Sequence, residues 1–325
     1  MTRLGRLSLL LLAAIAGCGK PAVEAQREGA YRIAVIPKGS THEFWRGVRA
    51  GAEKAAQELG TVKLLWKGPV QENDREGQIN VIQDFITQRV SGILLSPVDS
   101  QALVASVRDA QAEGIPTLVF DSGLDESADI VSFVATDNYH GGELAATRLA
   151  QAIGGKGKVA LLRHRQGSQS TGQRERGFLE TLAKQFPDVR VVESAVYAGT
   201  TPAEARANAE QLLVKYGKDL DGVFTVSEPN NDGMLEALDD ANLAGKVKFV
   251  GFDPSPAMIR GMQDGKVHGI VLQDPLRIGY LAVRTMAAHL AGQTVEKRVA
   301  TGEFLATPEN LQTPEIARLL HPARF

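Results

Sequence analysis

Short apolar runs alternate with amphipathic stretches along most of the chain. The apolar runs predict strands at 32–36, 62–66, 92–95, 117–120, 131–135, 158–163, 190–196, 222–226, 247–252 and 269–273. The stretches between them repeat apolar residues at helical spacing and predict helices at 44–59, 73–89, 100–113, 139–152, 172–185, 202–215, 231–242, 255–264 and 277–291. Continuous apolar strands separated by amphipathic helices are typical of parallel sheets covered on both faces.

The alternating pattern runs through two rounds, which predicts two domains. A single hydrophobic core stops growing at roughly 250–300 residues, and this chain has 325. We therefore expect an α/β protein built of two doubly wound, Rossmann-like parallel-sheet domains. The first crossing between them is expected near residues 135–137.

The first 18 residues have the features of an export signal. Two arginines precede the apolar run 7–15, which is too short to span a bilayer as a helix. The sequence Ile-Ala-Gly-Cys at 15–18 resembles the lipobox of bacterial lipoproteins, which implies cleavage before Cys18 and lipid attached to it. Residues 19–30 then form a tether. The alternative is an ordinary secretory signal in which Cys18 is incidental.

Composition and motifs exclude several classes of function. The chain has 36 Lys and Arg against 38 Asp and Glu, so it lacks the basic field that nucleic-acid binding needs. Cys18 is the only cysteine, which excludes an internal disulfide or a cysteine-based zinc site. No dinucleotide-binding glycine motif, Walker A loop, nucleophile elbow or His-Glu-x-x-His motif stands where it would be needed. We expect no cofactor and no metal.

Polar and aromatic side chains gather where the predicted strands end. They are Lys38, His42, Phe44, Trp45, Asp99, Asp121, Arg174, Ser227, Glu228, Asp253 and Gln273. In open parallel sheets, ligands bind beyond the carboxyl ends of the strands. Carboxylates, amides and a guanidinium can each form hydrogen bonds to two neighbouring hydroxyl groups, and flat aromatic rings pack against the C–H faces of a sugar. The pattern indicates a polyhydroxylated ligand.

At this level the sequence resembles the periplasmic sugar-binding proteins of the ribose-binding type, the solute receptors of ABC importers. The matching segments are IAVIPKGSTHEFWRGVRAGAEKAAQELG, the GILLSPVD turn at 92–99, IPTLVFDSG, VATDNYHGGELAA, RERGF, KFVGFDPSP and VLQDPLRIGY. The resemblance implies two discontinuous domains, 31–136 plus 274–291 and 137–273 plus 292–325, joined by a multi-stranded hinge. It places the return crossing near 273–275.

The resemblance also implies a set of ligand-binding residues. The aromatic pair of the family falls on Phe44 and Trp45, and His42 stands where the family has an asparagine. The remaining positions carried over are Asp121, Arg174, Ser227 with Glu228, Asp253 and Gln273, and Lys38 is an additional candidate. The arginine that follows the family's first aspartate is replaced by Ser122, so the family's ligand cannot simply be copied.

Some of these residues have structural alternatives. Trp45 shares helical spacing with Val48 and Ala52, so it could belong to the core. Asp99 is expected to cap the helix that follows it, as are Asp137 and Asn138. Arg176 is interpreted as a surface partner of nearby acids.

We therefore expect an exported, lipid-anchored, monomeric receptor that binds a sugar in the cleft, closes by a hinge and delivers the ligand to an ABC permease. A sensory receptor of the same fold, feeding a chemoreceptor or sensor kinase, is the alternative. A sugar-cleaving enzyme using Asp121 and Asp253 is a further alternative. A repressor of the same fold would need a DNA-binding domain where the export signal stands. The ligand could be a hexose, a deoxysugar, a polyol or a cationic small molecule.

Overall fold

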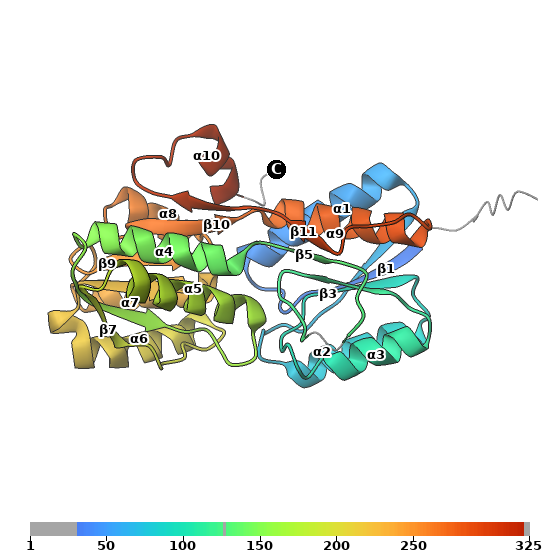
Figure 1. Ribbon diagram of the computed structural model, residues 1–325, viewed down its shortest axis with the longest axis horizontal. Helices are drawn as coiled ribbons and strands as arrows, with labels where there is room; N and C mark the ends of the chain where they lie inside the picture. The colour runs from blue at the N-terminus through green and yellow to red at the C-terminus, as the bar shows by residue number, and fades with distance from the viewer. Residues whose placement is uncertain (1–30, 126–127, 322–325) are drawn as a thin grey trace, which may run out of the picture.

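The computed structural model describes residues 31–125 and 128–321, so the expected export signal, the tether and Cys18 lie outside the described residues. Two six-stranded sheets lie side by side along the long axis of the molecule (Figure 1). The first sheet is parallel and has the order β11-β5-β4-β3-β1-β2. Its strands are β1 (Tyr31–Ile36), β2 (Val62–Trp66), β3 (Gly92–Leu95), β4 (Thr117–Phe120), β5 (Phe133–Ala135) and β11 (Arg298–Ala300).

The second sheet has the order β12-β10-β9-β8-β6-β7. Its strands are β6 (Gly157–Leu162), β7 (Val189–Glu193), β8 (Gly222–Thr225), β9 (Lys248–Phe252), β10 (Gly269–Gln273) and β12 (Glu303–Ala306). All neighbours are parallel except β12, which runs antiparallel to β10. This confirms the predicted fold class of two parallel-sheet α/β domains.

Alternating residues of the first sheet pack against helices on its two faces. Ile33 and Val35 join a core with α1 (Glu43–Leu59) and α9 (Pro275–Leu290). Ala34 and Ile36 join the core on the other face with α2 (Arg75–Thr87) and α3 (Val104–Ala112) (Figure 1). Because both faces are covered, every residue of β3 and β4 is buried, which explains the continuous apolar runs.

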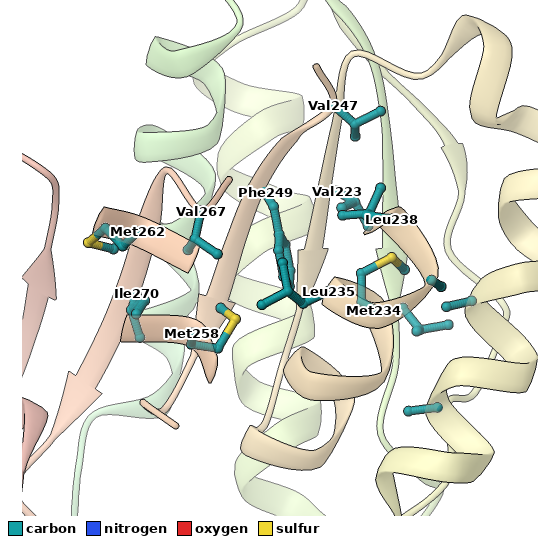
Figure 2. Packing of buried hydrophobic residues seen from close by; sticks show 14 of the residues in the cluster. Val223, Met234, Leu235, Leu238, Val247, Phe249, Met258, Met262, Val267 and Ile270 are labelled. Atoms are coloured by element: carbon teal, nitrogen blue, oxygen red, sulfur yellow. The ribbon is translucent and has the colours of Figure 1, made fainter. Parts of the chain in front are cut away.

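The second domain repeats this arrangement. The helices α4 (Asn138–Ala152) and α5 (Gln169–Gln185) cover one face. The other face is covered by α6 (Pro202–Tyr216), α7 (Glu228–Asp240), α8 (Pro256–Gln263) and the short α10 (Pro314–Leu320). Figure 2 shows the core on that face, where Phe249 of β9 packs among Met234 and Leu235 of α7 and Met258 of α8. A 3₁₀ turn, Gly217–Asp219, follows α6.

The chain passes between the two sheets three times, after β5, after β10 and after β11. The third crossing corrects the expectation that 292–325 lies entirely in the second domain, because β11 pairs with β5 of the first sheet. Thr136 and Thr301 lie on two of the crossing segments, with hydroxyl oxygens 3.5 Å apart. Sequence periodicity missed β11, β12 and α10 because these elements are short and only partly buried.

A second correction concerns the start of α7. The sequence SEPNND reads as a turn before a helix at 231–242, but the helix already begins at Glu228, with a proline in its first turn. Among the described residues, no helix has both the length and the apolar character needed to cross a bilayer.

Candidate ligand-binding site between the domains

A small cavity of about 30 Å³ lies between the two sheets. Its lining consists of Lys38, His42, Phe44, Trp45, Glu72, Asp121, Ser170, Thr171, Arg174, Ser227, Glu228, Pro229, Asp253 and Gln273. All ten candidate residues expected from the sequence are in this set. They meet there because each follows, or ends, a strand whose carboxyl end faces the gap between the domains.

Lys38 and Asp121 form a buried ion pair on the first domain. The Lys38 Nζ atom lies 3.1 Å from Asp121 Oδ2, and both side chains are almost inaccessible to solvent. The same carboxylate oxygen accepts a hydrogen bond of 2.7 Å from Ser96. Lys38 also donates across the gap to the hydroxyl group of Ser170, at 3.0 Å. This cation therefore links the strand ends of the first domain to the start of α5.

Arg174 and Asp253 form the matching ion pair on the second domain. Arg174 Nη1 lies 3.3 Å from Asp253 Oδ2, and Gln273 donates to the other carboxylate oxygen at 2.8 Å. Burial raises the pKa of Asp253, while Arg174 and Gln273 oppose the rise. Asn138 accepts from Arg174 Nε at 2.8 Å, and the guanidinium lies 3.6 Å above the centre of the Phe252 ring. The guanidinium is thus fixed from several sides.

Phe44 and Trp45 stand in the first turn of α1 with their rings at 81° and their centroids 4.9 Å apart. Trp45 is 2% exposed, packs edge-on against Phe120 and belongs to the hydrophobic core of the first domain. Its ring also lines the cavity. Both interpretations of this residue therefore apply: the indole is part of the core and part of the wall that a ligand would touch.

Glu228 closes the cavity from the second domain by binding the N-terminus of α1. Its two carboxylate oxygens accept hydrogen bonds from the backbone N–H groups of Glu43 at 3.1 Å and Phe44 at 3.2 Å. His42, the residue before α1, makes no side-chain capping bond, so the cap comes from the opposite domain. Burial raises the pKa of Glu228 to about 8, although His42 and the Phe44 N–H act against it.

Glu72 is the main site residue that sequence reasoning missed. It lies in the loop between β2 and α2 and is 9% exposed. Its carboxylate accepts from the indole N–H of Trp45 at 2.7 Å and contacts His42 Nδ1 at 3.4 Å and His164 Nε2 at 3.1 Å. Its position in the loop after β2 was the one sequence feature that pointed to the site, because that strand also ends at the gap between the domains.

Charged groups around Glu72 shift the protonation of this cluster. Burial would raise the pKa of Glu72, but hydrogen bonds from His164 and His42 hold that pKa well below its ordinary value. Burial would lower the pKa of His42, but the hydrogen bond and charge of Glu72 outweigh it, so the pKa is raised. The carboxylate therefore stays ionised inside the cavity wall.

Of the residues interpreted as structural, Asp137 behaves as expected and caps α4 through the N–H of His140. Asp99 accepts from the backbone N–H groups of Gln101 and Ala102, but these belong to a turn, because α3 begins only at Val104 and has no side-chain cap. Arg176 is exposed as expected, but it donates to the amide of Gln173 rather than to an acid. Asn138 differs, because its side chain holds Arg174 and so supports the site. Within the described residues, no group of His, Cys, Asp and Glu has the arrangement to hold a metal ion.

The sequence of this chain is similar to those of known proteins. Residues 33–294 match the model of a periplasmic binding protein domain. The ribose import binding protein RbsB of Bacillus subtilis is 31% identical over 265 residues, which cover 81% of this chain and 83% of that protein.

Two solved structures are similar over almost their whole length. A carbohydrate transporter solute binding protein from Agrobacterium radiobacter in complex with D-arabinose is 32% identical, with a TM-score of 0.85, covering 90% of this chain and 99% of that one. An ABC transporter solute binding protein from Agrobacterium vitis with bound D-fucose is also 32% identical, with a TM-score of 0.85 and coverages of 89% and 99%. The match spans both sheets and the cleft between them, and the chain belongs to the periplasmic binding protein family, as a solute-binding protein rather than an enzyme.

Proposed function

We propose that the protein is the receptor of an ABC importer and binds a neutral sugar or polyol between its domains. One observation carries the choice of ligand class: Gln273 lines the cavity, and its side-chain oxygen Oε1 is buried and has no hydrogen-bond partner. A buried amide oxygen without a donor costs about 1–3 kcal/mol. A ligand hydroxyl group would supply the missing donor.

The charges of the cavity favour a neutral ligand. Lys38 is paired with Asp121, Arg174 with Asp253, and Glu72 with the histidines at 42 and 164. Each ion pair is internal to the protein, so binding a sugar does not require a counter-charge from the ligand. Carboxylate and guanidinium groups bind pairs of adjacent hydroxyl groups, and the rings of Phe44 and Trp45 provide an apolar surface for the C–H groups of a sugar. These features argue against the cationic small molecule considered above.

A titration of purified protein against D-ribose, D-arabinose, D-fucose and xylitol tests the ligand class. We expect at least one of them to bind with a Kd near 1 μM, which corresponds to about −8 kcal/mol. Gln273→Leu should weaken that sugar about tenfold or more, because it removes the acceptor and leaves the Asp253 carboxylate with one donor fewer. Binding of simple amines, with none of the neutral compounds binding, would contradict the proposal.

Hinge closure is the proposed mechanism of capture. Contacts across the gap support it, among them Ser100 N to Gly167 O at 3.0 Å and Gly123 N to Gln169 Oε1 at 3.1 Å. They would be separated in an open form and remade around the ligand. A sugar shifts this equilibrium only by its greater affinity for the closed form. Small-angle X-ray scattering should show a smaller radius of gyration after the sugar is added; an unchanged radius would count against closure.

The family implies export to the periplasm, and we further propose attachment to a membrane through lipid on Cys18, followed by the tether 19–30. The support is the lipobox-like sequence that ends at the only cysteine of the chain. Multiple acyl chains give lasting attachment at about 0.8 kcal/mol per buried CH₂. Cys18→Ser should release the protein into the soluble periplasmic fraction and abolish labelling with radioactive palmitate. Retention in the membrane fraction would refute the anchor. The cleft is completed within one chain, which supports a monomeric receptor.

A further inference from the structure

His164 makes a contact across the gap that the binding of a sugar does not by itself require. It follows β6 in the second domain, is fully buried, and its Nε2 atom lies 3.1 Å from Glu72 Oε2 of the first domain. Its other ring nitrogen, Nδ1, lies 3.2 Å from the hydroxyl oxygen of Ser227. Both nitrogens of this histidine are therefore engaged when the domains are together.

The hydrogen bonds around Ser227 fix the direction of the bond to Nδ1. Asn230 donates through Nδ2 to the carbonyl oxygen of Gly199 at 3.0 Å, so its Oδ1 faces Ser227 as an acceptor. The Ser227 hydroxyl group uses its single proton for that oxygen, at 2.8 Å. His164 must then donate from Nδ1 to the Ser227 oxygen.

This direction determines the number of protons at the contact with Glu72. A neutral histidine that carries its proton on Nδ1 would turn the lone pair of Nε2 toward a carboxylate oxygen, and the two would repel each other. The contact is attractive only if one further proton lies between them, and because Glu72 stays ionised, that proton is on Nε2. The closed pair therefore holds one proton more than a neutral histidine and a separate carboxylate.

We propose that Glu72 and His164 form a proton-dependent latch across the cleft, so that closure on a ligand takes up one proton. Glu72 is then a positioning residue that acts through His164, and also through the indole of Trp45. The inference rests on the proposed function as a receptor that closes. It adds that the affinity for the sugar depends on pH.

The direction of the pH dependence follows from linkage. Because closure adds one proton to the pair, sugar binding weakens as the pH rises. Uptake of one full proton raises Kd about tenfold for each pH unit. Other ionisable groups surround this pair on the elements packed against it: His42, Arg163, Arg165, Glu175 and Asp253. Glu228 acts on His42. Burial also favours the protonated form of Glu228, which adds to the total proton uptake. The contribution of Glu72 and His164 is therefore measured by comparing a Glu72 variant with the unchanged protein.

The protons taken up on binding can be counted by calorimetry. The sugar of the titration panel that binds most tightly is titrated at pH 7.5 in buffers that differ in ionisation enthalpy. Glu72→Gln should take up about one proton fewer than the unchanged protein, because an amide N–H can donate to Nε2 of a neutral histidine. Glu76→Gln, a nearby exposed carboxylate on α2, is the matched control and should leave the count unchanged. Equal proton counts for the Glu72 variant and the unchanged protein would overturn the latch while leaving sugar binding established.

A ligand-free measurement tests the same pair. Gly123 and the side chain of Gln169 meet across the cleft, where the Gly123 N–H donates to Gln169 Oε1 at 3.1 Å. Gly123→Cys with Gln169→Cys is therefore the pair to oxidise, and loss of free thiol reports that a disulfide holds the domains closed. Cys18→Ser removes the only other thiol. In this locked protein, ¹⁵N NMR should show His164 protonated on both ring nitrogens at pH 7.5, and neutral when Glu72→Gln is added. A neutral His164 in the locked protein with Glu72 intact would refute the proposal.

Discussion

Asp121 and Asp253 occupy equivalent positions in the two domains, and both have left-handed backbone conformations, with φ of 61° and 72°. Each directly follows a strand that ends at the cleft, β4 in one sheet and β9 in the other. Each is paired with a buried cation, Lys38 or Arg174. Aspartate and asparagine tolerate this conformation better than other non-glycine residues. The two carboxylates are therefore held by backbone geometry as well as by charge.

Asp253→Asn should separate binding from folding. The amide keeps the tolerated backbone conformation but removes the charge that Arg174 and Gln273 contact, so we expect Kd for the sugar to rise about ten- to hundredfold. Asp253→Ala should lower stability as well, by about 1 kcal/mol, because alanine disfavours a positive φ. Calorimetric titration and thermal melting measure the two effects. An unchanged Kd for the asparagine variant would remove Asp253 from the binding site.

Ser170→Ala tests the contact of Lys38 across the cleft. The hydroxyl group of Ser170 lies 3.0 Å from Lys38 Nζ, whereas that of Ser168 lies at 3.5 Å. Loss of a hydrogen bond to a charged group costs about 1.5 kcal/mol, so Kd should rise about tenfold. The melting temperature of the ligand-free protein should change little, because the bond joins two domains. Ser168→Ala is the matched control and should have a smaller effect on Kd; equal effects would contradict the role of this contact.

Trp45 should affect both stability and binding, and two variants separate its roles. Trp45→Ala empties part of the core and should cost about 3–5 kcal/mol, lowering the melting temperature by about 10 °C. Trp45→Phe keeps an aromatic ring but removes the N–H that Glu72 accepts, so it should mainly raise Kd, by about fivefold. Thermal melting and sugar titration of both variants decide the question. A large loss of stability in the phenylalanine variant without a change in Kd would show a purely structural residue.

Glu175 should make the protein less stable as the pH rises toward neutrality. Burial raises the pKa of this carboxyl group to about 7, although Arg163 and the His164 N–H oppose the rise. The folded protein keeps a proton that the unfolded chain loses above about pH 4.5, so the stabilisation is complete below that pH and is lost through pH 7. The full change is about 3 kcal/mol.

Thermal or urea unfolding between pH 4.5 and 8 measures this dependence. Glu175→Gln should flatten the profile and stabilise the protein at pH 8. Glu236→Gln changes an exposed carboxylate on α7 and should leave the profile as it is. If the glutamine at 175 leaves the slope unchanged, the buried carboxyl group is not its source.

Much of the fold could be predicted from the sequence because both sheets are covered on both faces. A strand such as β3 is then apolar at every position and stands out from the amphipathic helices around it. The elements that were missed lack this contrast: β11 is largely exposed, and β12 is only partly buried. Their absence from the prediction is also why the third crossing between the domains was not foreseen.

The cavity-lining residues that come directly after a strand could be predicted from the sequence. Asp121 and Asp253 come directly after buried strands, where a carboxylate needs a specific partner. Glu72 comes six residues after β2, in a polar loop whose path cannot be read from spacing. The contact of Asn138 with Arg174 depends on how α4 packs beside α5, and the contact of Glu228 with α1 depends on how the two domains meet. No local sequence pattern records either arrangement.

The carboxylate of Glu228 at the N-terminus of α1 has a consequence for the compounds that the receptor rejects. Helix N-termini attract phosphate and carboxylate groups, but here both backbone N–H groups are already bound to a carboxylate of the protein itself. A sugar phosphate or a sugar acid could use these N–H groups only by displacing the Glu228 carboxyl group, which would then lose both hydrogen bonds while it stays buried. We expect the cleft to discriminate against such metabolites even where their ring and hydroxyl groups would fit.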